Sequence, residues 1–332
     1  MSAKTRPAVN RSNIPKTMHA VAIDRYGGPE VLSMHTLPVP VPTANEVLIA
    51  VHTAEVGGWD AEIRDGYSPD GKKPRFPLVL GVGGSGTVAA VGSRVRRFKD
   101  GEPVYAYAWS YPRTGFYAEY AVVPDKSAAA VPSPLDLEHA GAVPIAGITA
   151  LQGIDDALHV KKDERVIIYG ASGGLGVFAI QFAKLRGARV LATASGPDGV
   201  ALVRKLGADA AVDGRDGDIA RAAQEFAPEG VDAILALAGG ETLDRCIDAL
   251  RKGGRLAYPN GIEPEPKRRR GVKTTPYDGM PGRKEFEQLG RAVEAARLQV
   301  PIAAEFPLAD VVRAHQRLAQ GHVLGKVVLR VR

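Results

Sequence analysis

The residues best placed for chemistry form a glycine-rich turn that directly follows the apolar segment Val166-Ile167-Ile168-Tyr169. Glycines permit a tight turn and a close approach of the backbone to a diphosphate, and the free N–H groups that begin a helix attract negative charge. We expect this helix over about residues 175–185. The turn therefore predicts a phosphate-binding loop, whose candidate residues are Gly170, Ser172, Gly173, Gly174, Leu175 and Gly176.

Alternating strands and helices are expected on the C-terminal side of this turn. The strands fall at residues 189–194, 210–212, 231–237 and 254–258, and the helices at about 200–206, 219–226 and 242–250. Apolar strands separated by helices indicate a parallel sheet that is covered on both faces. Residues from about 150 to 300 therefore predict a doubly wound dinucleotide-binding unit.

The composition is that of a globular chain. Its 332 residues are enough for two domains, and 45% of them are hydrophobic. No apolar run reaches membrane-spanning length and no secretory signal is apparent, so we expect a cytoplasmic protein. Cys246 is the one cysteine, which excludes an intramolecular disulfide and a cysteine-rich metal site.

The net charge of +6 raises the question of nucleic-acid binding, but the excess cations lie in two segments. One is the N-terminal stretch, where residues 1–16 predict a flexible tail; an organellar transit peptide is the alternative, and Pro7 and Pro15 favour the tail. The other is the basic loop Lys267-Arg268-Arg269-Arg270. Since aromatic and basic residues do not interleave, nucleic-acid binding is not expected.

The first 145 residues predict a mostly β domain that shapes the substrate pocket. Short apolar runs at residues 46–52, 86–92 and 102–107 are bounded by Gly, Pro and Asp. A helix over about residues 308–318 and a strand at 325–330 end the chain. Loops at residues 64–77 and 263–280 are expected to set the specificity of the pocket.

The order of motifs resembles the medium-chain dehydrogenase/reductase superfamily, and within it the zinc-free quinone oxidoreductases, over residues 17–332. The resemblance implies an α/β protein with a GroES-like catalytic domain at residues 17–143 and 307–332, and a Rossmann domain with a doubly wound parallel sheet at 144–306. The motifs that carry it are Met18-His19-Ala20-Val21, Tyr26-Gly27-Gly28-Pro29-Glu30-Val31-Leu32, Leu80-Gly81-Val82-Gly83-Gly84-Ser85-Gly86, Val91-Gly92-Ser93-Arg94-Val95, residues 170–176, Leu206-Gly207-Ala208-Asp209 and Gly325-Lys326-Val327-Val328-Leu329.

Zinc-dependent members of that superfamily polarise an alcohol or carbonyl on a zinc ion held by Cys, His and sometimes Glu. Here the position of the first-ligand cysteine falls at Gly57, and the family's Gly-His-Glu falls on Gly81-Val82-Gly83. We therefore expect no zinc. The resemblance then implies hydride transfer from a reduced nicotinamide to a quinone or an α,β-unsaturated carbonyl.

The pocket's hydrogen-bond donors are left open by two departures from the zinc-free relatives, which often have Asn at the position of Gly57 and Tyr at that of Glu62. Catalytic residues are thus unknown. The candidates are Trp59, Arg64, Tyr67, Tyr107 and Tyr117, although a tyrosine in such a domain is packing as often as chemistry.

The residues that end the second strand of the nucleotide unit bear on cofactor choice. NAD-preferring folds place an acidic residue there, but this chain has Ala194 and Ser195. Without a carboxylate to repel a 2′-phosphate, and with Ser195 able to donate to it, we expect NADPH. Asp198 leaves a case for NADH, and Arg204 has an exposed helix face as its plain explanation.

Further cofactor contacts follow from the resemblance. Thr149 is expected near the nicotinamide, Gly239 on the adenosine side, and Asn260 and Gly261 near the nicotinamide ribose, because loops at the carboxyl ends of parallel strands bind ligands in this fold. Plain turns are the alternative for these loops. The resemblance also implies a homodimer.

Three functions remain open at this point. The expected one is a zinc-independent, NADPH-dependent reductase of quinones or α,β-unsaturated carbonyls. A reductase or dehydrogenase of another carbonyl or alcohol class is the second. The third is a non-catalytic NADPH-binding sensor or structural protein, because fold alone does not establish function.

Overall fold

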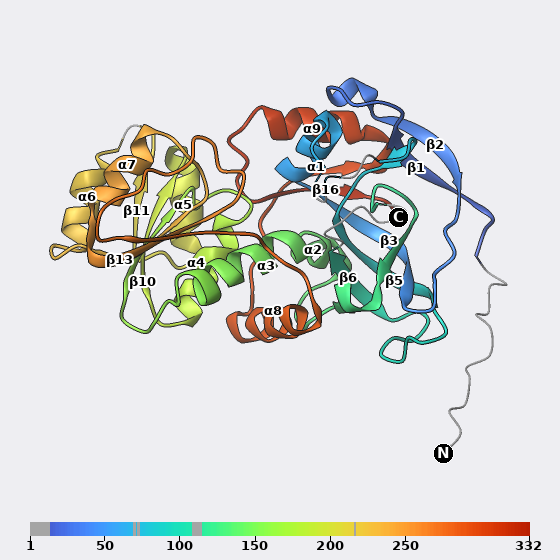
Figure 1. The fold of residues 1–332 in the computed structure, drawn as a ribbon, viewed down its shortest axis with the longest axis horizontal. Coiled ribbons are helices and arrows are strands. Elements are labelled where there is room, and N and C mark those ends of the chain that lie inside the picture. Colours follow the sequence, from blue (N-terminus) through green and yellow to red (C-terminus); the bar gives the residue numbers. More distant parts are fainter. Residues whose placement is uncertain (1–13, 69–70, 72–73, 108–114, 216) are drawn as a thin grey trace, which may run out of the picture.

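The computed structural model describes residues 14–68, 71, 74–107, 115–215 and 217–332. Most of the expected flexible tail, residues 1–13, and part of the expected loop at 64–77 lie outside the described residues. The described part forms two units that lie side by side, one built on mixed β-sheets and one on a parallel sheet (Figure 1).

The first unit is organised around strand β3, Glu46–Val56, which pairs antiparallel with β5, β7 and β16. The strand order of this sheet is β15-β16-β3-β5-β6-β8, with β7 on β3, and a smaller sheet has the order β2-β1-β4. Val327 of β16 pairs with Val56, so the last strand of the chain joins a sheet formed by the N-terminal half. The other strands are β1 (Thr17–Ile23), β2 (Ser33–Pro38), β4 (Leu78–Val79), β5 (Gly83–Val91), β6 (Pro103–Tyr107), β7 (Tyr120–Pro124), β8 (Ala128–Ala130), β15 (Ile302–Pro307) and β16 (Lys326–Arg330).

The second unit has six strands in the order β11-β10-β9-β12-β13-β14, and every neighbouring pair is parallel. The chain starts in the middle at β9, extends outward to β11, and returns to the centre at β12, so the order reverses between β9 and β12. Ligands bind in this fold at the carboxyl ends of the strands on either side of such a reversal. The strands are β9 (Arg165–Tyr169), β10 (Arg189–Ala194), β11 (Ala210–Asp213), β12 (Val231–Ala236), β13 (Leu250–Pro259) and β14 (Lys273–Tyr277).

Helices cover both faces of the parallel sheet because alternate side chains of its strands are apolar. Val166 and Ile168 of β9 pack in one core with α4 (Gly176–Leu185) and α5 (Gly196–Lys205). Ile167 and Tyr169 pack in a second core with α6 (Ile219–Phe226) and α7 (Glu241–Asp248). The first core continues into the β unit through α2 (Leu137–Gly141), α3 (Pro144–Gln152), α8 (Arg283–Ala296) and α9 (Val311–Ala319).

These arrangements confirm the predicted α/β fold with a GroES-like and a Rossmann unit. The predicted strands and helices after the glycine turn are present, with bounds shifted by a few residues. A loop over residues 263–280 was expected. This prediction is wrong for residues 273–277, which form strand β14 and pair with β13. β15 pairs with β16 in the sheet of the first unit, although the expected Rossmann range reached residue 306. The exact domain bounds stay a prediction.

The basic loop at residues 267–270 packs against α7. Lys267 Nζ lies 2.6 Å from the Asp244 carboxylate, and Arg269 donates to the Ile247 carbonyl oxygen at 2.7 Å. Two of its four cations are therefore engaged within the protein. Among the described residues, no helix is both long and apolar enough to cross a membrane.

Candidate cofactor and substrate site

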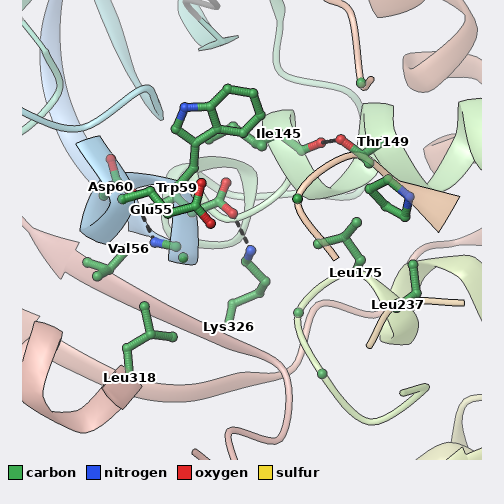
Figure 2. Close-up of a pocket in the computed structure, with 18 of the residues that line it drawn as sticks. Glu55, Val56, Trp59, Asp60, Ile145, Thr149, Leu175, Leu237, Leu318 and Lys326 are labelled. Carbon is green, nitrogen blue, oxygen red and sulfur yellow. Dashed lines mark hydrogen bonds and ion pairs between the residues drawn. The ribbon is translucent and has the colours of Figure 1, made fainter. Parts of the chain in front are cut away.

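A cavity of about 430 Å³ lies where the two units meet (Figure 2). Its volume is in the range of small-molecule sites. The walls combine the end of β3 and start of α1 (Gly58–Asp65), α3, the glycine turn, the segments that follow β12, β13 and β14, and the C-terminal segment around β16. The cavity thus borders the reversal point between β9 and β12.

The glycine turn presents backbone to this cavity. Gly170 has φ +77° and its N–H donates to Thr193 Oγ1 at 3.0 Å, which starts the turn at the end of β9. Gly176 packs so closely that a Cβ there would lie 2.5 Å from the backbone of Ala171. Gly173 is open, since a Cβ there would meet nothing closer than 3.5 Å. Gly173, Gly174 and Leu175 line the cavity, so the turn offers a cradle that fits a diphosphate.

Thr149 of α3 is held tightly at another wall of the cavity. Its hydroxyl donates to the Ile145 carbonyl oxygen at 2.8 Å, and the Tyr277 hydroxyl donates to the Thr149 carbonyl oxygen at 3.0 Å. A Cβ at Gly279 would lie 2.0 Å from Thr149 Oγ1, so a side chain is excluded there. Asn260 and Gly261 follow β13 and line the same cavity. These residues form one wall of the cavity.

Glu55 and Lys326 form an ion pair in the wall of the cavity (Figure 2). Their side chains are 3% and 5% exposed, and Glu55 Oε2 has no hydrogen-bond partner among the described residues. Burial raises the pKa of the Glu55 carboxyl, while Lys326 and the Ile145 N–H act in the opposite direction. A buried carboxylate of this kind can hold a proton at neutral pH.

Asp60 is a second buried carboxylate beside Glu55. Its oxygens accept from the Gly57 N–H at 2.9 Å and from the Val82 N–H at 3.3 Å. Because Asp60 lies in the first turn of α1, the Gly57 contact satisfies one of the free N–H groups at the start of that helix. Burial, with a smaller contribution from Glu55, raises the pKa of Asp60 to about 7.

A hydrogen-bonded chain leads from Asp60 away from the cavity. Tyr117 bonds to the Asp60 side chain, and its hydroxyl lies 3.2 Å from His315 Nε2. Arg64 Nη1 lies 2.9 Å from His315 Nδ1. Burial, and then Arg64, lower the pKa of His315 to about 4, so the ring is neutral and accepts from Arg64 at Nδ1. His315 Nε2–H then donates to Tyr117, which donates to Asp60.

Of the catalytic candidates chosen from the sequence, only some lie at the cavity. Trp59 lines the cavity. Tyr67 is 51% exposed and makes an edge contact with Trp59, with ring centroids 6.2 Å apart. Tyr107 and Tyr117 are buried, and Arg64 points to His315; these three are not among the described residues that line the cavity.

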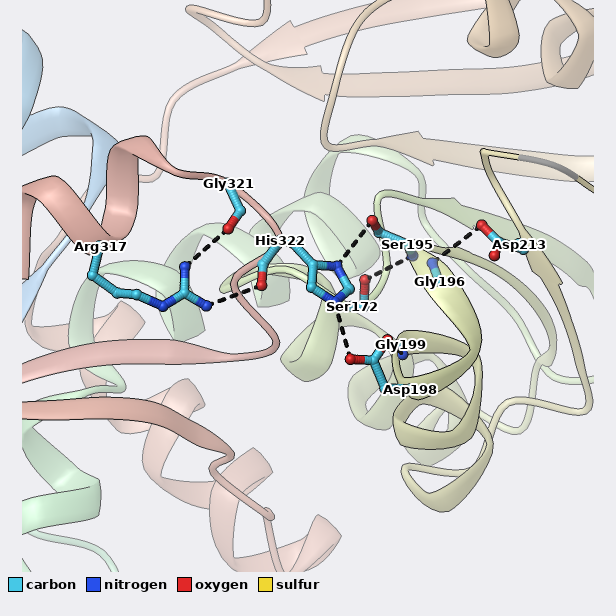
Figure 3. A network of polar contacts seen from close by, with 9 residues as sticks. All are labelled: Ser172, Ser195, Gly196, Asp198, Gly199, Asp213, Arg317, Gly321 and His322. Carbon is cyan, nitrogen blue, oxygen red and sulfur yellow. Dashed lines mark hydrogen bonds and ion pairs between the residues drawn. The ribbon is translucent and has the colours of Figure 1, made fainter.

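The adenosine end of the predicted site is closed by the C-terminal segment (Figure 3). His322 Nδ1 lies 3.1 Å from Ser195 Oγ, and His322 Nε2 lies 3.0 Å from Asp198 Oδ2. The Ser195 N–H donates to Ser172 Oγ at 3.3 Å, which connects the end of β10 to the glycine turn. Gly239 lies apart from this network, since a Cβ there would meet the backbone of Glu263 and Pro264 at 2.5 Å.

The residues at the positions where the resemblance places zinc ligands do not fit a zinc ion. Gly57 has no side chain and Val82 offers only carbon, whereas zinc takes thiolate, imidazole or carboxylate ligands. Among the described residues, no three His, Cys, Asp or Glu side chains gather as a metal set. The polar centre of this cavity is instead the Glu55–Lys326 pair.

Several residues of the site were not found from the sequence, namely Glu55, Asp60, Lys326, His322 and Tyr277. A signal existed for Glu55, because it is a charged residue in the otherwise apolar end of a buried strand, Ala54-Glu55-Val56. Lys326 lies in a motif that was recognised, but its role depends on the pairing of β16 with β3.

Comparisons with known proteins agree with this geometry. A family model described as alcohol dehydrogenase GroES-like domain matches residues 43–133, and one described as zinc-binding dehydrogenase matches residues 206–329. The quinone oxidoreductase of Homo sapiens is 32% identical over 335 residues, covering 95% of this chain and 98% of the relative.

Two solved structures are also similar over nearly the whole chain. One, an NAD-dependent alcohol dehydrogenase, has a TM-score of 0.88 and 31% identity, covering 95% of this chain and all of the other. The second, a mycobacterial protein complexed with NADPH, has a TM-score of 0.82 and 29% identity, with coverage of 95% and 100%. The chain belongs to the quinone oxidoreductase group of the medium-chain dehydrogenase/reductase superfamily.

Proposed function

We propose that this protein is a zinc-independent, NADPH-dependent oxidoreductase that transfers a hydride to quinones or α,β-unsaturated carbonyl compounds. The observation that carries the proposal is the cavity that joins the glycine turn to the wall made by Thr149 and Asn260 and to the Glu55–Lys326 pair. A nicotinamide cofactor supplies the hydride when it is bound. The membership of the quinone oxidoreductase group supports the same reaction class.

The protein's own residues position the reactants. The N–H groups of the glycine turn and the start of α4 bind the diphosphate, and Thr149 with Asn260 and Gly261 orients the nicotinamide end. Trp59, Val56 and Leu318 give the acceptor an apolar wall that excludes water. The carbonyl oxygen of the acceptor gains negative charge as the hydride arrives, and the polar groups that line the cavity are positioned to stabilise it.

The preference for NADPH over NADH rests on the end of β10. No acid stands at Ala194 or Ser195, and the carboxylate of Asp198 is already engaged by His322. With His322 Nε2–H donating to Asp198, the Ser195 hydroxyl donates to His322 Nδ1 and can turn to a 2′-phosphate instead. Asp213 accepts the N–H groups of Gly196 and Arg215 at 3.1 and 2.9 Å, both at Oδ1, so that oxygen is already engaged by the backbone.

The remaining parts of the proposal concern the state of the protein. We infer that it acts in the cytoplasm as a homodimer, without zinc and without nucleic acid as a ligand. Two other functions stay open: a reductase or dehydrogenase of another carbonyl or alcohol class, and a non-catalytic NADPH-binding sensor or structural protein.

Isotope transfer tests the reaction directly. NADPH carrying deuterium at C4 is incubated with the protein and a simple enone, and the product is examined by mass spectrometry and NMR. Deuterium at the β-carbon is expected. Deuterium at a carbonyl carbon would instead support the second function, and no transfer to any acceptor, with NADPH bound, would support the non-catalytic one.

A further inference from the structure

Lys326 stands between the phosphate-binding turn and the substrate part of the cavity. A Cβ built on Gly174 would lie 3.2 Å from Lys326 Nζ, so the ammonium group reaches the glycine turn. The preceding residue is fixed to the same turn, because the Gly325 N–H donates to the Ser172 carbonyl oxygen at 3.0 Å. On its other side Lys326 donates to Glu55 Oε1. Lys326 therefore lies within reach of both the Glu55 carboxylate and the predicted phosphate position at the glycine turn.

One carboxylate oxygen of Glu55 is enclosed by the protein without a hydrogen-bond partner among the described residues. Lys326 takes Oε1, while Oε2 is buried and has no hydrogen-bond partner among the described residues, although Glu55 lines the cavity. A buried polar atom without a partner is costly and calls for an explanation. Oε2 would have a role if it carried a proton and donated that proton to a bound acceptor.

The charged groups around Glu55 favour such a proton. Asp60 of α1 repels the Glu55 carboxylate, and Lys326 of β16 attracts it. Tyr107 of β6 also lies within range of both carboxylates and of Asp278 in the segment after β14. The Ile145 N–H of α3 faces Glu55. Two buried carboxylates thus lie within electrostatic range of each other, and Lys326 is the ion-pair partner of Glu55.

We propose that Glu55 donates the proton that completes reduction of the acceptor, and that Lys326 is drawn from Glu55 to the cofactor's diphosphate when the cofactor binds. This inference rests on the proposed reductase function. The diphosphate at Gly174 competes for the ammonium group, and Glu55, deprived of its counter-charge, takes up a proton from water. Binding of the cofactor is therefore expected to protonate Glu55 and so to prepare it as the proton donor.

The reaction balances with a reduced nicotinamide as the reductant. The acceptor receives a hydride, which is one proton together with two electrons, at its electron-poor carbon. The π electrons of the acceptor move to its carbonyl oxygen. The Glu55 O–H bond breaks, its proton goes to that oxygen, and the carboxylate keeps the bonding pair. The acceptor has then gained two hydrogens, and the Glu55 carboxylate is reprotonated from solvent before the next turnover.

Proton uptake on binding tests the coupling without turnover. NADPH and ADP-ribose, which has the diphosphate but no nicotinamide, are titrated calorimetrically near pH 7 in buffers with different ionisation enthalpies. The wild type is expected to take up a fraction of a proton with both. Glu55→Gln is expected to lose this uptake, and Glu305→Gln, which alters an ion-paired carboxylate on β15 outside the cavity, is expected to keep it. Uptake that is the same in Glu55→Gln and wild type would overturn the coupling.

Kinetics test the proton transfer. Glu55→Gln is expected to lower kcat by about a hundredfold, the usual contribution of a general acid, and to lose the fall in kcat that the wild type shows as pH rises. Cofactor affinity should not fall, because the Lys326 ammonium group no longer has to leave a charged partner to reach the diphosphate. A kcat within twofold of wild type, with an unchanged pH profile, would overturn the proposal.

Glu55→Gln leaves a buried lysine without its partner and could therefore fail to fold. A second variant keeps the test decisive in that case. Glu55→Gln combined with Lys326→Met removes both charges, and is expected to stay folded, to bind ADP-ribose without proton uptake, and to have the same low kcat. Normal turnover by this double variant would also overturn the proposal. If the wild type itself reduces no acceptor, the proposed function fails, while the calorimetric experiment still decides whether Lys326 links the cofactor to Glu55.

Discussion

Ser195 Oγ and His322 Nδ1 lie 3.1 Å apart, although 127 residues separate them in the sequence. His322 has φ +47°, and Arg317 holds the carbonyl oxygens of Gly321 and His322 at 2.9 and 3.1 Å. The C-terminal segment is thereby fixed over the end of β10. A segment that follows α9 of the first unit thus borders the proposed adenosine end of the nucleotide site (Figure 3).

Cofactor preference should respond to charge at Ser195. Ser195→Asp places a carboxylate at the end of β10, where it would repel a 2′-phosphate and accept from a ribose hydroxyl. We expect the ratio of NADH to NADPH affinity to rise by about tenfold or more, equivalent to about 1.4 kcal/mol. Fluorescence titration of both cofactors measures this ratio. Asp198→Asn, which removes a nearby carboxylate, should move the ratio the other way; equal effects on both cofactors would contradict the assignment.

Substitution of two glycines of the turn should affect different properties of the protein, cofactor binding in one case and stability in the other. A methyl group at Gly173 meets nothing closer than 3.5 Å, so Gly173→Ala should fold normally but bind NADPH more weakly by about tenfold or more, because the methyl group occupies the cradle. At Gly176 a methyl group would lie 2.5 Å from the Ala171 backbone, so Gly176→Ala should destabilise the protein by about 2 kcal/mol. Thermal melts and cofactor titrations separate the two effects.

The comparison between these two variants is its own control. A Gly173→Ala protein that binds NADPH with wild-type affinity would show that the turn is not the phosphate cradle.

Tyr117 should contribute to stability rather than to turnover. Tyr117→Phe removes the hydroxyl that joins Asp60 to His315, and leaves their buried polar atoms without that partner. We expect the free energy of unfolding to fall by about 1–3 kcal/mol, with kcat changed less than about twofold because Tyr117 is not among the described residues that line the cavity. Denaturant unfolding and steady-state kinetics provide the two measurements. A large loss of kcat in a stably folded variant would restore Tyr117 as a catalytic candidate.

The free energy of unfolding should depend on pH through His315. Its pKa falls from 6.5 in the unfolded chain to about 4 in the folded protein, chiefly because of burial. Between these values the unfolded state binds more protons, so stability is present above pH 6.5 and is lost as pH falls toward 4. The loss from this group is about 3 kcal/mol at its limit.

The measurement for His315 is the difference between wild type and His315→Gln across this pH range. The Gln amide can still accept from Arg64 and donate to Tyr117, but it does not titrate. The variant should therefore lose stability less steeply on acidification. Parallel pH curves for the two proteins would contradict the neutral, buried assignment of His315.

Much of the fold could be predicted because its signals are local. Residues 189–194 form an apolar run with clear ends, and β10 has these same bounds. β14 was missed because Lys273-Thr274-Thr275-Pro276-Tyr277 has no apolar run, and its pairing with β13 decides its conformation. α8 was missed for a related reason: its mostly polar sequence has four buried side chains, which pack against other elements.

The candidate site was predictable only where chemistry and conformation coincide in one segment. The glycine turn is such a segment. The Glu55–Lys326 pair is not, because it joins residues 271 positions apart through the pairing of β16 with β3. The tyrosines were chosen for their side-chain chemistry, which cannot distinguish a hydroxyl in a cavity from one in a buried network such as that of Tyr117.

Reduction of quinones or enones by NADPH, without zinc, is the property on which the other proposals depend. NADPH oxidation is followed with a panel of quinones, enals and simple ketones, in metal-free buffer with a chelator present. We expect chelator-resistant turnover with a quinone or an enone, faster with NADPH than with NADH. Binding of NADPH without oxidation by any acceptor, or turnover that the chelator abolishes and zinc restores, would contradict this function.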